Sequence, residues 1–190
     1  WSSDVCSSDL GNNISLEANT SSDLHTTTAS ASSLLNLNSQ QDVRVAGGSY
    51  TSSGGTVQVS AGRDIFAGSG AQFQGPTIQM NASRNATLSS TPFNEINVRG
   101  FNLLDVRALQ NLTVNNTIVT GVSGSTARLT AGDLLSVSSL ALTGAANISL
   151  SARTVDLINV TFPVGSSVNL KSEFGLLAAN PNTGAASVPG

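Results

Sequence analysis

Charged side chains are scarce in this chain. They make up 10% of its 190 residues, with eight Lys or Arg against eleven Asp or Glu. The basic residues occur singly, so the chain lacks both the basic patch of nucleic-acid-binding proteins and the polybasic run that attaches to anionic membranes. It also lacks an apolar stretch near the length of about 18 residues that spans a bilayer. We therefore expect no nucleic-acid partner and no membrane span.

The side chains that most often carry out chemistry are nearly absent. The chain has one His, His25, and one Cys, Cys6. A Ser-His-Asp triad needs three side chains that meet in space, whereas His25, Asp23 and the nearby serines follow one another along a single turn. A zinc site needs a second His or Cys to share the metal. The calcium-binding nonapeptide of β-rolls is missing as well. The sequence therefore predicts no catalytic, cofactor-binding or metal-binding residue.

The first ten residues, W-S-S-D-V-C-S-S-D-L, resemble nothing downstream and hold the only Trp and the only Cys. Reverse translation offers an explanation. The string TGG AGT TCA GAC GTG TGC TCT TCC GAT CT encodes them, once one more base completes the last codon, and it matches the end of a widely used short-read sequencing adapter. We treat residues 1–10 as a non-native segment, with further coils expected upstream of residue 11. The alternative is a genuine, disordered Ser/Asp-rich terminus.

What the chain does contain is a repeat. A five-residue motif recurs at intervals of 21, 22, 21, 26, 23, 21 and 20 residues. Its first and third positions are apolar, its fifth is small, and its second and fourth can be any residue. The eight copies begin at Ile14, Leu35, Val57, Ile78, Leu104, Ala127, Ile148 and Val168. The fifth position is always Ala or Ser, namely Ala18, Ser39, Ala61, Ala82, Ala108, Ala131, Ala152 and Ser172. This alternation is the period of a β-strand with one buried face.

Two further strands are expected in each repeat. Eight and ten residues past most anchors, apolar pairs recur, for example Val43 with Val45 and Leu135 with Val137, and the seventh copy slips by one to Val155 and Leu157. A third, looser strand is indicated by Tyr50, Phe73, Phe93, Ile118, Leu142 and Phe162. Among these we expect Tyr50, Phe73 and Phe93 to stack inside the coil.

Short strands at a period near 21 residues predict an all-β fold, a right-handed single-stranded parallel β-helix (β-solenoid) of about eight coils. The right hand follows from the crossover rule for parallel strands. We expect the β-helix domain to cover residues 11–178. A turn-rich tail, 179–190, is expected to leave the coil. The small fifth residue is expected where the coil turns and a larger side chain would not fit.

Several runs resemble haemagglutinin-type repeats, namely V-S-A-G-R-D-I (59–65), L-T-A-G-D-L-L (129–135) and N-I-S-L-S-A-R (147–153). Such repeats build the β-helical shafts of large secreted bacterial exoproteins, including filamentous adhesins and autotransporter passengers. The tail F-P-V-G-S-S-V-N-L-K-S-E-F-G-L-L (162–177) is similar to the end segment of very long surface proteins of environmental bacteria. The resemblance implies a secreted or cell-surface location and an elongated structural or adhesive role. It carries over no catalytic residue.

The enzymatic alternative is a polysaccharide lyase or hydrolase, since many of these are β-helices. Such enzymes need acids and bases clustered on one outer wall. Counting from the anchor of each repeat places Arg63 and Arg84 at the same position on neighbouring coils. Asp42 and Asp64 share the position that follows it. This ladder is either a site or a solvated edge that pairs charges weakly. The alternative enzyme would have its active coils outside this chain.

The 26-residue interval predicts an insertion, T-P-F-N-E-I-N-V-R-G-F (91–101), that bulges from the rod. Insertions on solenoids often form the binding face, so Arg99 and Phe101 are candidates for contact with a partner, as are Arg63 and Arg84 of the ladder. The other interpretation of Phe101 is a loop that tucks its ring against the core. The sequence favours a non-catalytic stalk whose partners are glycans or cell surfaces.

Overall fold

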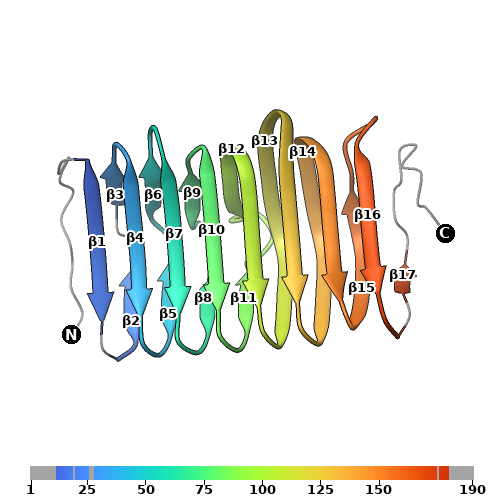
Figure 1. The fold of residues 1–190 in the computed structure, drawn as a ribbon, viewed down its shortest axis with the longest axis horizontal. Coiled ribbons are helices and arrows are strands. Elements are labelled where there is room, and N and C mark those ends of the chain that lie inside the picture. The colour runs from blue at the N-terminus through green and yellow to red at the C-terminus, as the bar shows by residue number, and fades with distance from the viewer. Residues whose placement is uncertain (1–11, 19, 26–27, 175, 180–190) are drawn as a thin grey trace.

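The computed structural model describes residues 12–18, 20–25, 28–174 and 176–179, and these form one parallel β-solenoid (Figure 1). Its coils stack along the long axis and make about seven turns of about 21 residues. Eight coils were expected from eight motif copies, but eight stacked strands enclose only seven intervals. The right-handed sense stays a prediction. Cys6 with residues 1–10, and residues 180–190 of the expected tail, lie outside the described residues.

The motif strands stack as one sheet, which we call face 1 and which lies at the front in Figure 1. Every neighbouring pair is parallel, and the anchors are in register, as in Ile14 with Leu35 and Ile78 with Leu104. Face 1 comprises β1 (Asn13–Ala18), β4 (Leu34–Ser39), β7 (Thr56–Ala61), β10 (Thr77–Ala82), β16 (Ser167–Ser172) and the C-terminal parts of β12 (Ile96–Ala108), β13 (Asn111–Ala131) and β14 (Leu134–Ala152).

Two more sheets close each coil. Face 2 contains β2 (Ser22–His25), β5 (Val43–Ala46), β8 (Ile65–Ala67), β11 (Ala86–Ser89), the first parts of β13, β14 and β15 (Thr154–Thr161), and β17 (Leu176–Ala179). The predicted slip in the seventh copy is confirmed, since Leu135 pairs with Val155. Face 3 contains β3 (Thr28–Ala31), β6 (Ser49–Ser52), β9 (Gln72–Gln74), the first part of β12, the middle of β13 and β14, and the end of β15.

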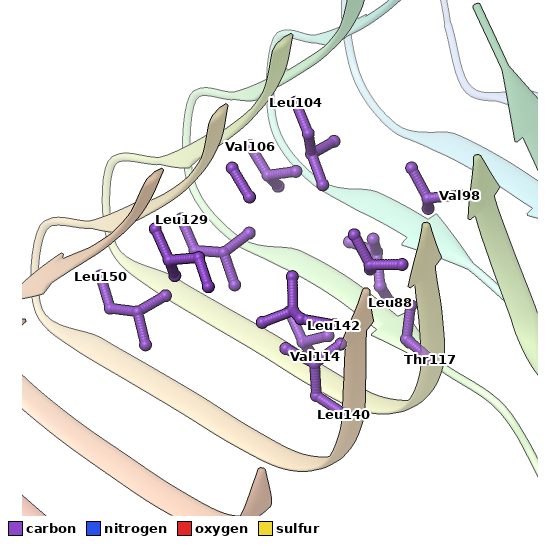
Figure 2. A pocket seen from close by; sticks show the side chains of 13 residues that line it. Leu88, Val98, Leu104, Val106, Val114, Thr117, Leu129, Leu140, Leu142 and Leu150 are labelled. Atoms are coloured by element: carbon purple, nitrogen blue, oxygen red, sulfur yellow. The ribbon is translucent and has the colours of Figure 1, made fainter. Parts of the chain in front are cut away.

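The core lies inside the coil because alternate side chains of all three faces point inward. It is closely packed. Between β11 and β14 it leaves a void of about 10 Å³, lined by side chains such as Leu88, Leu142 and Leu150 (Figure 2). A space of this size holds at most about one water, and an almost wholly apolar wall offers that water too few polar partners. This part of the described interior is therefore structural and offers no room for a ligand.

The third strand was only partly predicted. Tyr50 and Phe73 are buried and stack with ring centroids 5.4 Å apart, as expected. Phe93 does not join them, because its side chain is 99% exposed. The residue aligned with Phe73 is Val98, and the next in that inward column is Val119. Ile118, another marker of the expected third strand, is one residue out of phase with this column and partly exposed, since a one-residue shift turns a strand side chain to the other face.

The small fifth residues stack in one column at the end of face 1, where the chain turns toward face 2. Ala108 pairs with Ala131, and both are buried, as is Ala152. The corner is tight at the next position too. A Cβ on Gly132 would lie 1.9 Å from the carbonyl oxygen of Leu109 on the preceding coil. In the coil of β13 the chain therefore needs short side chains to leave face 1.

We expect Ala131→Leu to lower the free energy of unfolding by about 1–3 kcal/mol, because three added carbons must fit into a filled corner. Urea denaturation followed by circular dichroism measures the change. Ala141→Leu is the matched control. Ala141 lies in the face 3 segment of β14, the strand that follows Ala131 along the chain, and it is exposed. Its replacement should therefore change stability by less than about 0.5 kcal/mol. Equal tolerance of both substitutions would contradict the role of the small residue.

Candidate functional site

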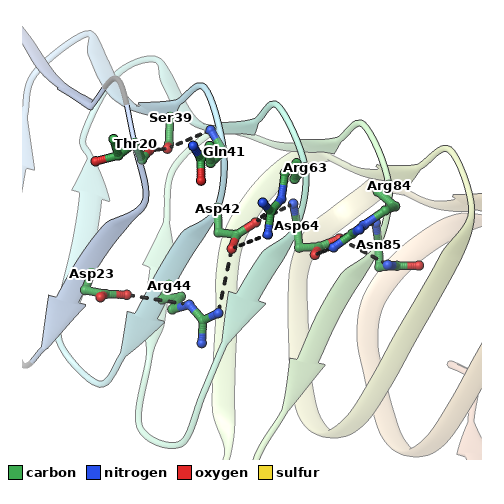
Figure 3. Close-up of polar contacts among 10 residues, drawn as sticks. All are labelled: Thr20, Asp23, Ser39, Gln41, Asp42, Arg44, Arg63, Asp64, Arg84 and Asn85. Carbon is green, nitrogen blue, oxygen red and sulfur yellow. Dashed lines mark hydrogen bonds and ion pairs between the residues drawn. The ribbon is translucent and has the colours of Figure 1, made fainter.

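The most concentrated group of charges lies at the corner between face 1 and face 2, in the coils of β4, β7 and β10 (Figure 3). We call it the Asp/Arg ladder, formed by Asp42, Arg63, Asp64 and Arg84. Its turns stack directly, since the backbone N–H of Arg63 donates to the carbonyl of Gln41 at 2.8 Å and that of Arg84 to the carbonyl of Arg63 at 2.9 Å. The offsets in the sequence predicted this arrangement correctly.

Asp64 is the most fully bonded member of the ladder. Its residue is 4% exposed, and Nε of Arg84 donates to Oδ1 at 2.9 Å while the second guanidinium nitrogen pairs with Oδ2. The backbone N–H and the side-chain amide of Asn85 donate to the same Oδ1 at 3.0 and 3.1 Å. The hydrogen bond from Arg84, assisted by those from Asn85, lowers the pKa of Asp64 to about 2 although burial opposes the shift.

Asp42 repeats this pattern one coil earlier. Nε of Arg63 lies 3.3 Å from Oδ1, and the backbone N–H of Asp64 donates to the same oxygen at 3.3 Å. Arg44 approaches from face 2, with a guanidinium nitrogen 3.7 Å from Oδ2 of Asp42 and Nε 3.7 Å from Oδ1 of Asp23. Each carboxylate thus binds the arginine and the turn backbone of the following coil, so the ladder links successive coils.

The hydrogen bonds and ion pairs to the two carboxylates limit the chemistry that the ladder can perform. A general acid or base needs a pKa near the working pH, and Asp64 is far below that range. Both carboxylates are nearly inaccessible, with 6% of each side chain exposed, whereas the side chains of Arg63 and Arg84 are about half exposed at 49% and 46%. Among the residues that the structure describes, no group of three His, Cys, Asp or Glu side chains could hold a metal ion. The arrangement fits a stabilising contact between coils.

The insertion was located only approximately. The extra residues form the turn between β11 and β12, with Phe93 at φ 75°, and strand pairing resumes at Ile96. The turn is held to the preceding coil, since the N–H of Gly70 donates to the carbonyl of Asn94 at 3.0 Å and that of Thr91 to the hydroxyl of Ser69 at 3.1 Å. The exposed aromatic ring of the insertion is therefore that of Phe93, which the sequence analysis placed inside.

The two predicted contact residues of the insertion differ in their accessibility. Phe101 is 0% exposed, so its ring belongs to the core and cannot touch a partner, which corrects the contact prediction for this residue. Arg99 is exposed on face 3, where Nη2 and Nε donate to the side-chain carbonyls of Gln72 at 3.0 Å and Gln74 at 3.2 Å. Its role in binding stays a prediction, as do those of Arg63 and Arg84.

The pair of Asp105 and Arg107 lies outside the ladder and was not predicted from the sequence. Arg107 donates to Asp105 two residues earlier in β12, through Nε at 3.0 Å and Nη2 at 2.6 Å. The signal was the spacing itself, because residues i and i+2 of a strand point to the same side. As for His25, its backbone pairs with Ala46 in β2 and β5.

Comparison of the chain with protein-family models, curated proteins and solved structures gives no match. In the described part of the chain no helix has the length and apolar character needed to cross a membrane.

Proposed function

We propose that this solenoid serves as a shaft in a secreted or surface-exposed bacterial protein, with a structural or adhesive role and no catalytic activity. The observation that carries the proposal is the unbroken parallel register, in which each face 1 strand pairs with the next from β1 to β16. In such an array each coil contacts only its neighbours, so the rod can be extended without changing its cross-section. Low charge and many short polar side chains suit a rod that must remain separate from other rods.

The state of the ladder supports the non-catalytic part of the proposal. Lyases and hydrolases of this architecture need carboxylates or bases that can reach a sugar. Here the carboxylates of Asp42 and Asp64 are buried beneath their arginines, and the pKa of Asp64 is lowered to about 2. The resemblance to haemagglutinin-type repeats supports the surface location.

We expect the purified 190-residue chain to release no product from polygalacturonate, alginate or xylan. Reducing-end assays detect hydrolysis, and ultraviolet absorbance of unsaturated sugars detects elimination. Cleavage of any of these polymers would favour the enzymatic alternative.

In cells that encode the chain, protease added outside intact cells should remove the epitope seen by an antibody to the solenoid. A protected epitope would contradict the surface location.

A further inference from the structure

The outward side of face 1 changes its charge along the rod. Between Thr126 and Lys171 its outward positions carry two cations, Arg128 and Lys171, and no acid. The remaining outward positions there are short polar residues, namely Thr126, Thr130, Asn147, Ser149, Ser151, Ser167 and Asn169. This is a positive surface on a chain whose formal net charge is −3.

Arg128 differs from the other arginines in having no partner among the residues that the structure describes. Within the described residues Arg44, Arg63, Arg84, Arg107 and Arg153 contact acids, and Arg99 contacts two glutamines. Arg128, which is exposed, has neither an ion pair nor a hydrogen bond in that part of the chain. Its neighbour in register on β12 is Asp105, but that carboxylate is held by Arg107. The acids at the adjoining corner pair with Arg153. Its Nη1 lies 3.5 Å from Oδ1 of Asp133, and its Nε lies 3.8 Å from Oε2 of Glu173.

Arg128 lines an open hollow of about 470 Å³ on face 1. The hollow forms because small side chains, Ser149 and Asn169, follow Arg128 on the next two coils. Thr126, Asn147 and Ser167 complete its polar wall. A guanidinium without a partner presents a planar set of donors that matches an oxyanion with two acceptor oxygens. Amides and hydroxyls at successive coils, about 4.8 Å apart, can donate to and accept from sugar hydroxyls along an extended ligand.

We propose that this hollow binds an acidic polysaccharide, with Arg128 pairing a carboxylate or sulfate of the sugar chain and Asn147, Ser149 and Asn169 contacting its hydroxyls. The proposal rests on the adhesive part of the proposed function. Charge complementarity supports an anionic occupant. The polar wall favours a polysaccharide over an acidic peptide, because protein partners usually depend on buried aromatic or aliphatic anchors, and the wall's one apolar residue, Ile148, is itself buried.

Affinity electrophoresis of the whole chain tests the proposal, in gels containing polygalacturonate, dextran sulfate, neutral dextran or poly-glutamate. We expect retardation by one or both acidic polysaccharides and none by dextran or poly-glutamate. The two acidic gels distinguish carboxylate from sulfate recognition. Arg128→Gln should weaken the apparent affinity about tenfold or more, the effect of losing a charge-assisted contact. Thermal unfolding should be unchanged, because the side chain of Arg128 has no partner within the described residues.

Arg44→Gln is the matched control, since it removes the same charge from an exposed arginine on face 2 that is already paired with Asp23 and Asp42. It should change the affinity by less than about twofold, as expected for a screened, distant charge. Retardation by neither acidic polysaccharide, equal retardation by poly-glutamate, or equal loss in both variants would overturn the site. A chain that binds none of these polymers, cleaves nothing and is exposed on cells would overturn the site and leave the structural role standing.

Discussion

Phe101→Ala is expected to lower the free energy of unfolding by about 3–5 kcal/mol, the usual cost of removing a buried aromatic ring. The ring is 0% exposed and fills space that a neighbouring residue leaves free. Phe101 pairs with Gly121 on the next coil, and a Cβ added at Gly121 would lie 3.0 Å from two atoms of the ring. Glycine at 121 therefore makes room for phenylalanine at 101. Urea denaturation followed by circular dichroism measures the loss.

Phe93→Ala is the matched control, because it removes the same ring from the same insertion. The side chain of Phe93 is 99% exposed, so its removal should change the free energy of unfolding by less than about 0.5 kcal/mol. The sequence alone assigned Phe93 to the interior and left Phe101 open between a surface contact and a ring tucked against the core, and the second interpretation is confirmed. A larger loss from Phe93→Ala than from Phe101→Ala would therefore reject the register of β12 described above.

The repeat predicted faces 1 and 2 well because their strands lie at nearly fixed offsets from the anchor. Face 3 follows the most variable turn, so a fixed offset fails there. In the coil of β10 and β11, the added turn residues move the inward position from Phe93 to Val98. Apolar residues on both sides of an insertion look equally suited to the core. Only the pairing of Val98 with Phe73 distinguishes them.

The ladder was predicted as a juxtaposition, but its chemistry was not. Fixed positions within each repeat are enough to bring Arg84 beside Asp64 of the preceding coil. They do not reveal that the carboxylate is buried, or that Asn85 adds two more donors to it. Those contacts depend on how the turn directs its backbone N–H, which a residue pattern does not encode. They decide between a reactive carboxylate and a structural one.

Asp64→Asn should lower the free energy of unfolding by about 1–3 kcal/mol at neutral pH. The amide keeps one acceptor oxygen for Asn85 and for Nε of Arg84, but it replaces the other oxygen with an NH₂ group that faces the second guanidinium nitrogen. One charge-assisted bond is therefore lost, and the bond from Nε no longer meets a negative charge. Asp133→Asn is the matched control. Asp133 pairs with Arg153 at 3.5 Å with 55% of its side chain exposed, and such surface pairs contribute less than about 1 kcal/mol. Similar losses in the two variants would contradict a specific role for the buried carboxylate.

The pH dependence provides a second, independent test of the same carboxylate. Folding lowers the pKa of Asp64 from 3.8 to about 2, so the ionised form is favoured in the folded chain. Its contribution is fully present above pH 3.8 and is lost as the pH falls through about 2. After allowance for water around the half-exposed Arg84, that contribution is about 1–2 kcal/mol. The difference in stability between the parent chain and Asp64→Asn should therefore be constant from pH 7 to 5 and shrink between pH 4 and 2. A difference that stays constant down to pH 2 would mean that Asp64 stabilises the coil through its shape and not through its charge.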